Sequence, residues 1–420
     1  MKKYNVAILG ATGAVGQEML KVLEEYDIPV GKLLPLASAK SAGGTVRFKG
    51  EDVKIEEARE ESFEGMDFVL GAVKNPMSRR FAPAIVKSGA VYIDNSSAFR
   101  MDPEVPLVVP EINGEDAFKN KGIIANPNCS SIITLMAVAA LAKLSPIKSM
   151  IACTYQAVSG AGQAGLVELE SQMLALAEGK AVEPKVFPAQ IAMNVIPHIG
   201  DELDNLYTDE EMKMQNEGRR ILHAPELAVT CTCVRVPVMR SHSISVTLRT
   251  ERKISVDEAR DAIRTFPGVR LIDDYQGRNY PTPLDTSNQD LVWVGRVRED
   301  LTDANGLTLW CCGDQIRKGA ASNAVQILKK MIEKKTALIR KPSPGICPGD
   351  GFIFHIFRRY QQSCAPAGTL SSSMMRCSSS FPSISRTADR SMPLDICPII
   401  LRGGRLRIAT TVLPTSCSGS

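Results

Sequence analysis

One segment near the N-terminus decides the fold: YNVAILGATGAVGQEMLKVLEE, residues 4–25. Residues 4–9 form a short apolar run that ends in glycine, as buried strands of a parallel sheet do. Residues 17–25 carry apolar side chains at helical spacing, with charges between them. A strand, a glycine-rich turn and a helix in this order predict the first βα unit of a doubly wound sheet.

The turn between this strand and helix is a candidate phosphate-binding loop. Its glycines have the spacing G-x-x-G-x-x-G, which differs from the usual dinucleotide fingerprint. Glycines let the backbone approach a pyrophosphate, and free N–H groups of the first helical turn point at it. The alternative is a plain β–α turn without a ligand. We expect the loop to bind a dinucleotide cofactor through Gly10, Thr12, Gly13, Ala14 and Val15.

The following segments continue the alternation of strands and helices. Buried strands are predicted over Lys32–Ala37, Phe68–Ala72 and Ala90–Ile93, and a helix over Arg80–Ser88. This is the pattern of a parallel sheet with helices on both faces.

A second pattern begins near residue 149. Val229–Val238 and Ser243–Thr250 alternate in polarity, as half-exposed antiparallel strands do, and Gly319–Lys334 reads as one amphipathic helix. We therefore predict an α/β protein with three parts. A Rossmann-type dinucleotide-binding domain is expected over residues 1–128, completed by a closing helix at 319–335. A mixed α/β domain follows over 129–318, and a tail over 336–420.

Composition limits the class of protein. The chain has 420 residues, of which 44% are hydrophobic and 23% charged, close to the averages of globular proteins. The longest nearly unbroken apolar stretch, residues 132–142, is about half as long as a membrane span requires. No signal peptide fits the N-terminus, so the expected compartment is the cytoplasm.

The tail differs sharply from the rest of the chain. Residues 336–420 contain ten Lys or Arg and three Asp or Glu, whereas residues 1–335 contain 40 and 43. The mildly acidic body has no electrostatic footprint for nucleic acid. Five of the eleven cysteines lie in the tail, at spacings that match no zinc site. A disordered basic tail or an unnatural extension is favoured over a metal module or a targeting segment.

The cofactor is predicted from the end of the second strand. NAD-binding proteins usually place an acid there to hold the ribose 2′-hydroxyl. Here the strand is followed by Ser38, Lys40 and Ser41, with no acid in that segment. A cation between two hydroxyls suits a 2′-phosphate, so NADP is expected rather than NAD. The alternative is a solvated turn.

Cys129 is the candidate nucleophile. It follows the turn Asn126-Pro127-Asn128 and precedes an apolar helix, so it lies at a helix N-terminus. Unpaired N–H groups and the helix dipole there stabilise a thiolate, and we expect a lowered pKa. The alternative is an inert core cysteine. A thiolate beside a nicotinamide oxidises or reduces an acyl group through a thioester and a thiohemiacetal.

At this point the sequence resembles the aspartate-semialdehyde dehydrogenase family, over residues 3 to about 334. The resemblance rests on six motifs in order: Gly10–Gly16, Asp94–Arg100, Asn126–Ser131, Thr154–Gly162, Arg235–Ser243 and Lys318–Asn323. It implies a reversible, NADP-dependent reductive dephosphorylation of L-aspartyl 4-phosphate to L-aspartate 4-semialdehyde. That step lies on the route to lysine, threonine, methionine and diaminopimelate. The family also implies that the mixed α/β domain over 129–318 is the catalytic and dimerisation domain of a dimer or tetramer, and we expect a homodimer.

The resemblance also implies roles for single residues. His242 matches the acid/base histidine, and an imidazole titrates near neutral pH, as proton shuttling requires. Arg235 matches the arginine that binds the substrate carboxylate, and Arg100 matches a phosphate ligand. Further substrate contacts are expected from Asn128, Gln156, Glu210 and Lys213. Ser159 and Gly160 match cofactor contacts, and Asn323 is expected to meet the carboxamide end of the cofactor.

Other readings remain open from the residues alone. Cys231 and Cys233 could suggest a metal site, but alternation along a strand explains them better, and no metal site is expected. N-acetyl-glutamyl-phosphate reductase shares the architecture and the cysteine chemistry. A glyceraldehyde phosphate dehydrogenase would need a Ser-Cys-Thr-Thr segment, which is absent. A non-catalytic dinucleotide sensor would need neither nucleophile nor histidine.

Overall fold

The N-terminal sheet is built from the predicted alternation. In the computed structural model, which describes residues 2–340, this sheet has six parallel strands in the order β5-β2-β1-β6-β7-β8. The strands are β1 (Tyr4–Leu9), β2 (Val30–Ala37), β5 (Glu56–Glu57), β6 (Phe68–Gly71), β7 (Val91–Asp94) and β8 (Ile123–Ala125). A separate hairpin joins β3 (Thr45–Phe48) to β4 (Glu51–Lys54). The expected Rossmann-type sheet is confirmed.

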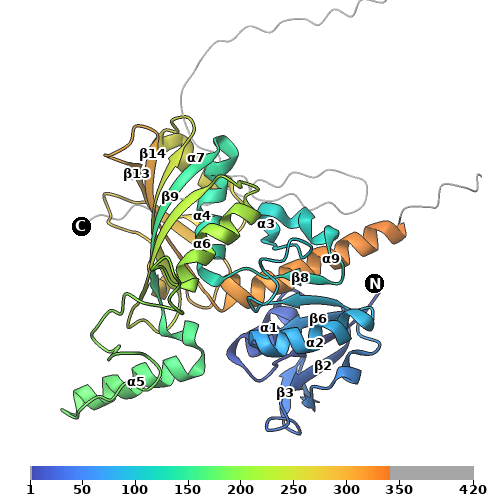
Figure 1. Ribbon diagram of the computed structural model, residues 1–420. Coiled ribbons are helices and arrows are strands. Elements are labelled where there is room, and N and C mark those ends of the chain that lie inside the picture. Colours follow the sequence, from blue (N-terminus) through green and yellow to red (C-terminus); the bar gives the residue numbers. More distant parts are fainter. Residues whose placement is uncertain (1, 341–420) are drawn as a thin grey trace, which may run out of the picture. The chain divides into compact units, whose positions relative to one another are not determined.

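Helices cover this first sheet. They are α1 (Ala14–Glu25), α2 (Asn75–Lys87), α3 (Pro110–Asn113) and α9 (Ser322–Arg340), with 3-10 turns at Glu60–Phe63 and Gly114–Lys119. The last helix returns from the far end of the chain and packs its apolar face with α1 and β1 in one hydrophobic cluster. The predicted closing helix therefore exists, and it lies beside the first sheet as expected (Figure 1).

The second sheet is mixed. Its order is β10-β9-β11-β14-β13-β12. The strands are β9 (Ile147–Gln156), β10 (Ala228–Arg235), β11 (His242–Thr250), β12 (Val269–Leu271), β13 (Val292–Glu299) and β14 (Gly306–Gly313). One expectation is wrong: the strand predicted over 229–238 is not antiparallel to its neighbour, because β10 lies at the edge of the sheet next to β9. The connection from β9 to β10 contains two helices, so β10 runs parallel to β9, while β11 runs antiparallel to it.

The helices of the second domain are α4 (Cys129–Leu144), α5 (Gln163–Ala177), α6 (Asp209–Ile221), α7 (Val256–Thr265) and α8 (Pro283–Thr286). A 3-10 turn at Val158–Ala161 and a π-helical turn, η4 (Arg317–Ala321), complete the elements. Helix α4 is apolar on every face and is buried along most of its length, so it forms the core beneath the sheet. Helix α5 lies on an arm that projects from the body (Figure 1).

The described residues all lie in one compact unit. Helix α9 runs to Arg340 and so includes the first five residues assigned to the tail, while the rest of the predicted tail lies outside the described residues. Within residues 2–340, no helix has the length and apolar character needed to span a membrane.

Candidate active site

Cys129 is the first residue of α4, as the sequence predicts. The side chain of Asn128 caps this helix by accepting hydrogen bonds from the N–H groups of Ser130 and Ser131, at 2.9 and 3.2 Å. Cys129 as a whole residue is half-buried. Gly319 lies directly beside it, because a Cβ added there would come within 2.9 Å of the Cys129 Cβ. The helix start and the turn before α9 therefore meet at the nucleophile.

His242 is the first residue of β11, and the start of this strand lies beside Cys129. Its Nε2 lies 3.4 Å from the Cys129 Sγ. Its Nδ1 accepts a hydrogen bond from the Ala157 N–H at 3.0 Å, and the ring is fully buried. Because Nδ1 is an acceptor, the proton of the neutral imidazole is on Nε2, facing the sulfur. The predicted pair is therefore assembled, with a defined tautomer.

The expectation of a lowered pKa for Cys129 is wrong. Burial, followed by the nearby Glu210 carboxylate, raises the pKa of the Cys129 thiol to about 12, although Arg100 and Arg235 act in the opposite direction. Burial and the positive charge of Arg235 lower the pKa of His242 to about 3. The pair is thus a neutral thiol and a neutral imidazole, because burial outweighs the helix N-terminus.

Glu210 is the centre of a polar cluster beside the cysteine. Its carboxylate accepts hydrogen bonds from Asn128 Nδ2 at 3.0 Å, Gln156 Nε2 at 3.2 Å and Lys213 Nζ at 3.0 Å. Burial alone would raise the pKa of Glu210, but Lys213, Asn128 and Gln156 outweigh it and lower the pKa to about 2. Three of the predicted substrate residues are therefore gathered around the negative charge of a fourth, Glu210.

The two predicted arginines have different surroundings. Arg235 ends β10, is 7% exposed and donates one hydrogen bond, to the Ala157 carbonyl at 2.8 Å. Arg100 donates to the Asn126 carbonyl at 2.9 Å, the Asn95 carbonyl at 2.7 Å and the Glu217 carboxylate at 3.0 Å.

Glu217 is a functional-site residue that the sequence analysis missed. It is 1% exposed, and its second oxygen accepts the Asn128 N–H at 2.7 Å. It therefore ties Arg100 to the cap of the nucleophile helix. The sequence contained a signal for it. Lys213 and Glu217 follow Glu210 by three and seven residues, so the three side chains share one face of a helix.

The glycine loop has the geometry expected of a phosphate-binding turn. Gly10 has a φ of 94°, and a Cβ at Gly16 would lie 2.3 Å from the Gly10 carbonyl oxygen. Gly13 precedes α1 without a capping side chain, and the first turn of α1 has no acid. The N–H groups of that turn are therefore available to an anion.

A cavity of about 540 Å³ adjoins this loop. Gly10, Thr12 and Ser38 line it, whereas Lys40 and Ser41 do not. Five further charged residues line the same cavity and were missed by the sequence analysis: Glu57, Arg59, Glu60, Glu61 and Arg80. Glu57 ends the strand paired beside the end of β2, so no pattern along the chain could place it next to Ser38.

Two other predicted cofactor contacts lie in the 3-10 turn at Val158–Ala161. Ser159 is 5% exposed and accepts a hydrogen bond from Gln315. A Cβ at Gly160 would lie 2.8 Å from Arg235 Nη1 and 3.6 Å from the His242 Nε2, so Gly160 lies against the site.

Asn323 does not support the expected contact with the cofactor. It is fully buried, and its amide donates to the Val108 carbonyl at 2.9 Å and to Asn126 Oδ1 at 2.7 Å. Its oxygen accepts from the buried Lys318 at 2.9 Å. Asn323 therefore holds the turn that precedes Cys129.

Cys231 and Cys233 point to the same side of β10, into the core, with their sulfur atoms 3.8 Å apart. Strand alternation accounts for their spacing.

Comparison with known proteins identifies the class. Residues 5–120 match the NAD-binding domain of semialdehyde dehydrogenases, and residues 138–318 match the dimerisation domain of the same group. The fold is thus that of a two-domain semialdehyde dehydrogenase.

Individual relatives narrow this class. Aspartate-semialdehyde dehydrogenase of Synechocystis is 48% identical over 329 residues, covering 78% of this chain and 97% of that protein. The enzyme of the same name from Bacillus subtilis is 45% identical over 80% of this chain and 99% of its own length. A crystal structure of aspartate semialdehyde dehydrogenase II from Vibrio cholerae superimposes with a TM-score of 0.77 at 42% identity, covering 79% of this chain and 99% of that one. The chain belongs to the aspartate-semialdehyde dehydrogenase family.

Proposed function

We propose that this protein catalyses the reversible, NADP-dependent reductive dephosphorylation of L-aspartyl 4-phosphate to L-aspartate 4-semialdehyde. The product feeds the synthesis of lysine, threonine, methionine and diaminopimelate. The observation that carries the proposal is the 3.4 Å approach of the Cys129 Sγ to the His242 Nε2, at the start of a helix, in a chain of this family. A V. cholerae relative, 41% identical, is complexed with ASA in its crystal structure.

Cys129 acts as the nucleophile. Its sulfur attacks the carbonyl of the acyl phosphate, the carbon–oxygen bond to phosphate breaks, the thiol proton leaves with the phosphate, and a thioester on Cys129 forms. The dinucleotide that the glycine loop would hold would supply the hydride for reduction of the thioester. His242, with its proton on Nε2, hydrogen-bonds to the substrate oxygen while that oxygen is negatively charged. The Cys129–carbon bond breaks as the carbonyl re-forms, and the released sulfur takes up one proton from solvent, relayed through His242 Nε2.

The polar cluster binds the amino-acid part of the substrate. Arg235 has donors left for a carboxylate, which an arginine binds through two parallel hydrogen bonds. Glu210 is ionised and suits the substrate ammonium. An ammonium at Glu210 also offsets the charge that contributes to the high pKa of Cys129.

Phosphate is assigned to Arg100 and Lys213. Arg100 donates three of its five N–H groups within the described residues, so two are left for phosphate oxygens. Lys213 is held by Asp209 and Glu210 at 2.7 and 3.0 Å, and Glu210 keeps it charged by raising its pKa against the effect of burial.

The cofactor site fits a dinucleotide. The uncapped start of α1 suits a pyrophosphate, and the adjoining cavity of about 540 Å³ has room for an adenosine. We assign the 2′-phosphate to Ser38, Lys40 and Ser41. Lys40→Ala should raise KM for NADP much more than KM for NAD; equal effects would remove this assignment.

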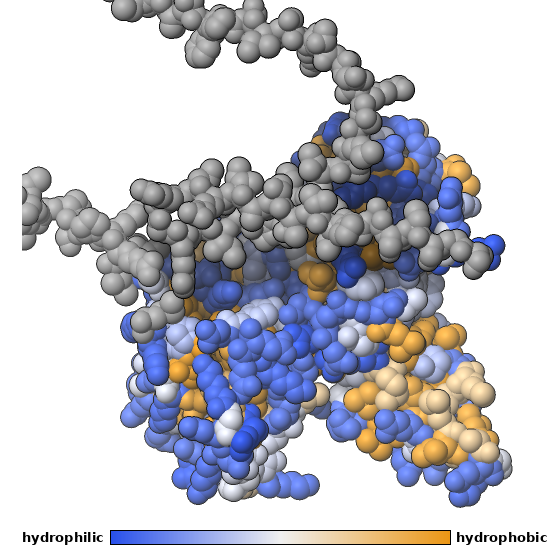
Figure 2. Space-filling model, turned by 180° about the vertical axis from the view of Figure 1, so that it is seen from behind, coloured by the Kyte–Doolittle hydropathy of each residue, from blue (hydrophilic) through white to orange (hydrophobic). Residues whose placement is uncertain are grey.

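A homodimer is assigned through the arm of α5. Figure 2 shows hydrophobic residues gathered on the projecting part of the surface that contains this arm. Val167, Met173 and Leu174 on α5 are 52%, 56% and 65% exposed. All lie within the residues that match the dimerisation domain. An apolar surface of this kind is covered by a partner in most soluble proteins, here a second copy.

Light scattering tests the dimer. Leu174→Glu should lower the measured mass toward that of a monomer, whereas Leu301→Glu, at a fully exposed leucine outside the arm, should not. An unchanged mass for Leu174→Glu would exclude α5 from the interface.

We further assign residues 1–128 with 319–335 to the cofactor domain and residues 129–318 to the catalytic domain. A thiol nucleophile works in a reducing compartment, which supports the cytoplasm. One assay tests the function: turnover of aspartate semialdehyde, phosphate and NADP, followed as NADPH formation. Turnover of N-acetyl-glutamate semialdehyde but not of aspartate semialdehyde would favour the related reductase.

A further inference from the structure

Catalytic His242 is preceded by a residue with an unusual backbone. Ser241 is fully buried and has a φ of 73°, a backbone conformation that residues other than glycine rarely adopt. Such a residue persists when its surroundings hold it. Its N–H donates to Gln315 Oε1 at 2.8 Å, and its hydroxyl lies 3.2 Å from that of Ser287. The position of His242 therefore depends on what holds this segment.

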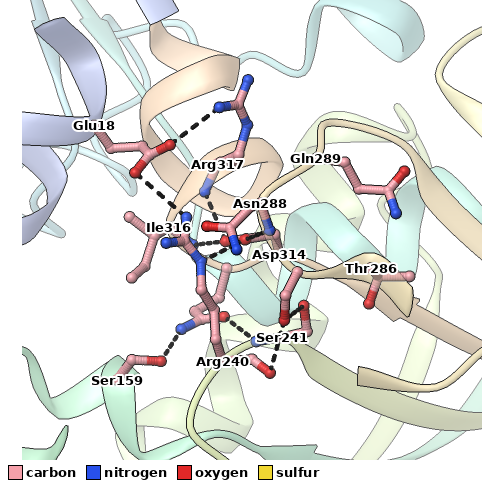
Figure 3. A network of polar contacts seen from close by, with 12 residues as sticks. Glu18, Ser159, Arg240, Ser241, Thr286, Asn288, Gln289, Asp314, Ile316 and Arg317 are labelled. Atoms are coloured by element: carbon pink, nitrogen blue, oxygen red, sulfur yellow. Dashed lines mark hydrogen bonds and ion pairs between the residues drawn. The ribbon is translucent and has the colours of Figure 1, made fainter. Parts of the chain in front are cut away.

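Arg240, one residue earlier, is the main anchor of the segment. Its Nε donates to Asp314 Oδ2 at 2.6 Å, and Asp314 is fully buried. The other oxygen of Asp314 accepts the N–H groups of Ile316 and Arg317, at 2.9 and 3.0 Å. The side chain of Arg240 is thus fixed against the turn that leads into α9 (Figure 3).

The second partner of Arg240 comes from the cofactor domain. Glu18 lies on α1, one turn after the glycine loop, and is 5% exposed. Its carboxylate lies 3.4 Å from Arg240 Nη2 and 3.1 Å from Arg317 Nη1. Arg240 Nη2 is buried and makes no hydrogen bond within the described residues, so the charge of Glu18 is its nearest compensation. Figure 3 shows Glu18 between the two guanidinium groups.

We propose that Glu18 is a positioning residue for the reaction, which acts through Arg240 on the placement of His242. The inference rests on the proposed function, since it concerns the proton step of that reaction. The helix that carries Glu18 also presents its N-terminus to the cofactor pyrophosphate. One carboxylate thus connects the cofactor-binding helix to the strand that carries the acid/base.

The substitution Glu18→Gln tests this role. It keeps the size of the side chain and removes the charge opposite Arg240. A reacting group displaced by about 1 Å costs up to about 100-fold in rate, so we expect kcat to fall by roughly 10- to 100-fold. KM for semialdehyde and NADP should change by less than about twofold, because the residues that bind them are untouched. The solvent deuterium isotope effect on kcat should rise, because proton transfer becomes more limiting.

The matched control is Glu25→Gln. Glu25 lies on the same helix and pairs with Arg317, but it has no contact with Arg240. This variant should keep the kcat and the isotope effect of the wild type. If both variants lost kcat in proportion to their melting temperatures, with an unchanged isotope effect, Glu18 would be a structural residue and the proposal would fail.

A second variant tests whether Glu18 acts through Arg240. Arg240→Lys keeps a charge for Asp314 but cannot span both carboxylates, so it should reproduce the kcat of Glu18→Gln. If Glu18 acts through Arg240, the double variant should be no slower than either single variant. If the losses of kcat in the two single variants multiplied in the double variant, the proposal would be overturned, even if Glu18→Gln folded poorly. A wild-type protein without turnover would refute the function itself, whereas a normal wild type with an equally fast Glu18→Gln would refute only the positioning role.

Discussion

Removing Arg100 should destabilise the protein as well as weaken phosphate binding. Its guanidinium lies 3.0 Å from the Glu217 carboxylate, and the two side chains are 10% and 1% exposed. Arg100→Leu would leave a buried carboxylate without its counter-ion. Breaking a buried ion pair by removing one partner costs about 3–5 kcal/mol. At roughly 2 °C per kcal/mol for a large domain, the melting temperature should fall by roughly 6–10 °C.

Thermal unfolding followed by circular dichroism measures this loss, and Arg235→Leu is the matched control. Arg235 is as deeply buried as Arg100, but its one hydrogen bond within the described residues is to a carbonyl. Its removal should cost about 1 kcal/mol, a small shift in melting temperature. Both variants lose a buried guanidinium, so they differ mainly in the carboxylate that is left behind.

The double variant Arg100→Leu/Glu217→Gln should recover part of the loss. Glutamine removes the uncompensated charge, and its oxygen can still accept the Asn128 N–H that Glu217 binds at 2.7 Å. The ion pair would not be a stabilising element of the site if Arg100→Leu had the melting temperature of the wild type. The same would follow if the double variant had a lower melting temperature than Arg100→Leu.

The remaining predictions concern the reaction. Cys129→Ala should abolish turnover, whereas His242→Asn should slow it by roughly 10²–10⁴-fold and still form an acyl adduct visible by mass spectrometry; an adduct on another residue would contradict the assignment. Iodoacetamide should alkylate Cys129 ever faster between roughly pH 6 and pH 10, because a raised pKa keeps the thiol protonated; a plateau near pH 7 would mean an activated thiolate. Arg235→Leu should raise KM for the semialdehyde, and Arg100→Leu KM for phosphate; equal changes in both constants would merge the two roles. A chain that ends at Arg340 should keep full activity, since all assigned residues precede it.

Local patterns in the sequence were sufficient for the first elements of the fold. The apolar run of β1, the glycine turn and the helical spacing of α1 each follow from a few neighbouring residues. The direction of β10 was not predictable in this way. Alternation places a strand half-buried in a sheet but does not say which neighbour it pairs with, and here the helices between β9 and β10 decide it.

The site shows the same division between local and long-range information. Cys129 was identifiable because its helix start and its turn are adjacent in the chain. Glu18 precedes Arg240 and Asp314 by more than two hundred residues. Their association depends on how α1 packs against the segments that lead into β11 and η4. Nothing in the composition of these segments distinguishes such residues from solvated charges, which are the commoner case.

The protonation state of Cys129 shows how burial changes an inference from local structure. A helix N-terminus stabilises a thiolate, and the sequence correctly places the cysteine there. The ionised Glu210 and the loss of solvent act in the opposite direction and raise the thiol pKa. A thiol that is neutral without substrate is protected from oxidation and from reaction with stray electrophiles. A substrate ammonium at Glu210 would relieve part of the opposing charge, so the nucleophile would be activated by the substrate that it attacks. Glu210→Gln should therefore raise the alkylation rate of Cys129 at neutral pH while it raises KM for the semialdehyde, and a slower alkylation in this variant would refute the coupling.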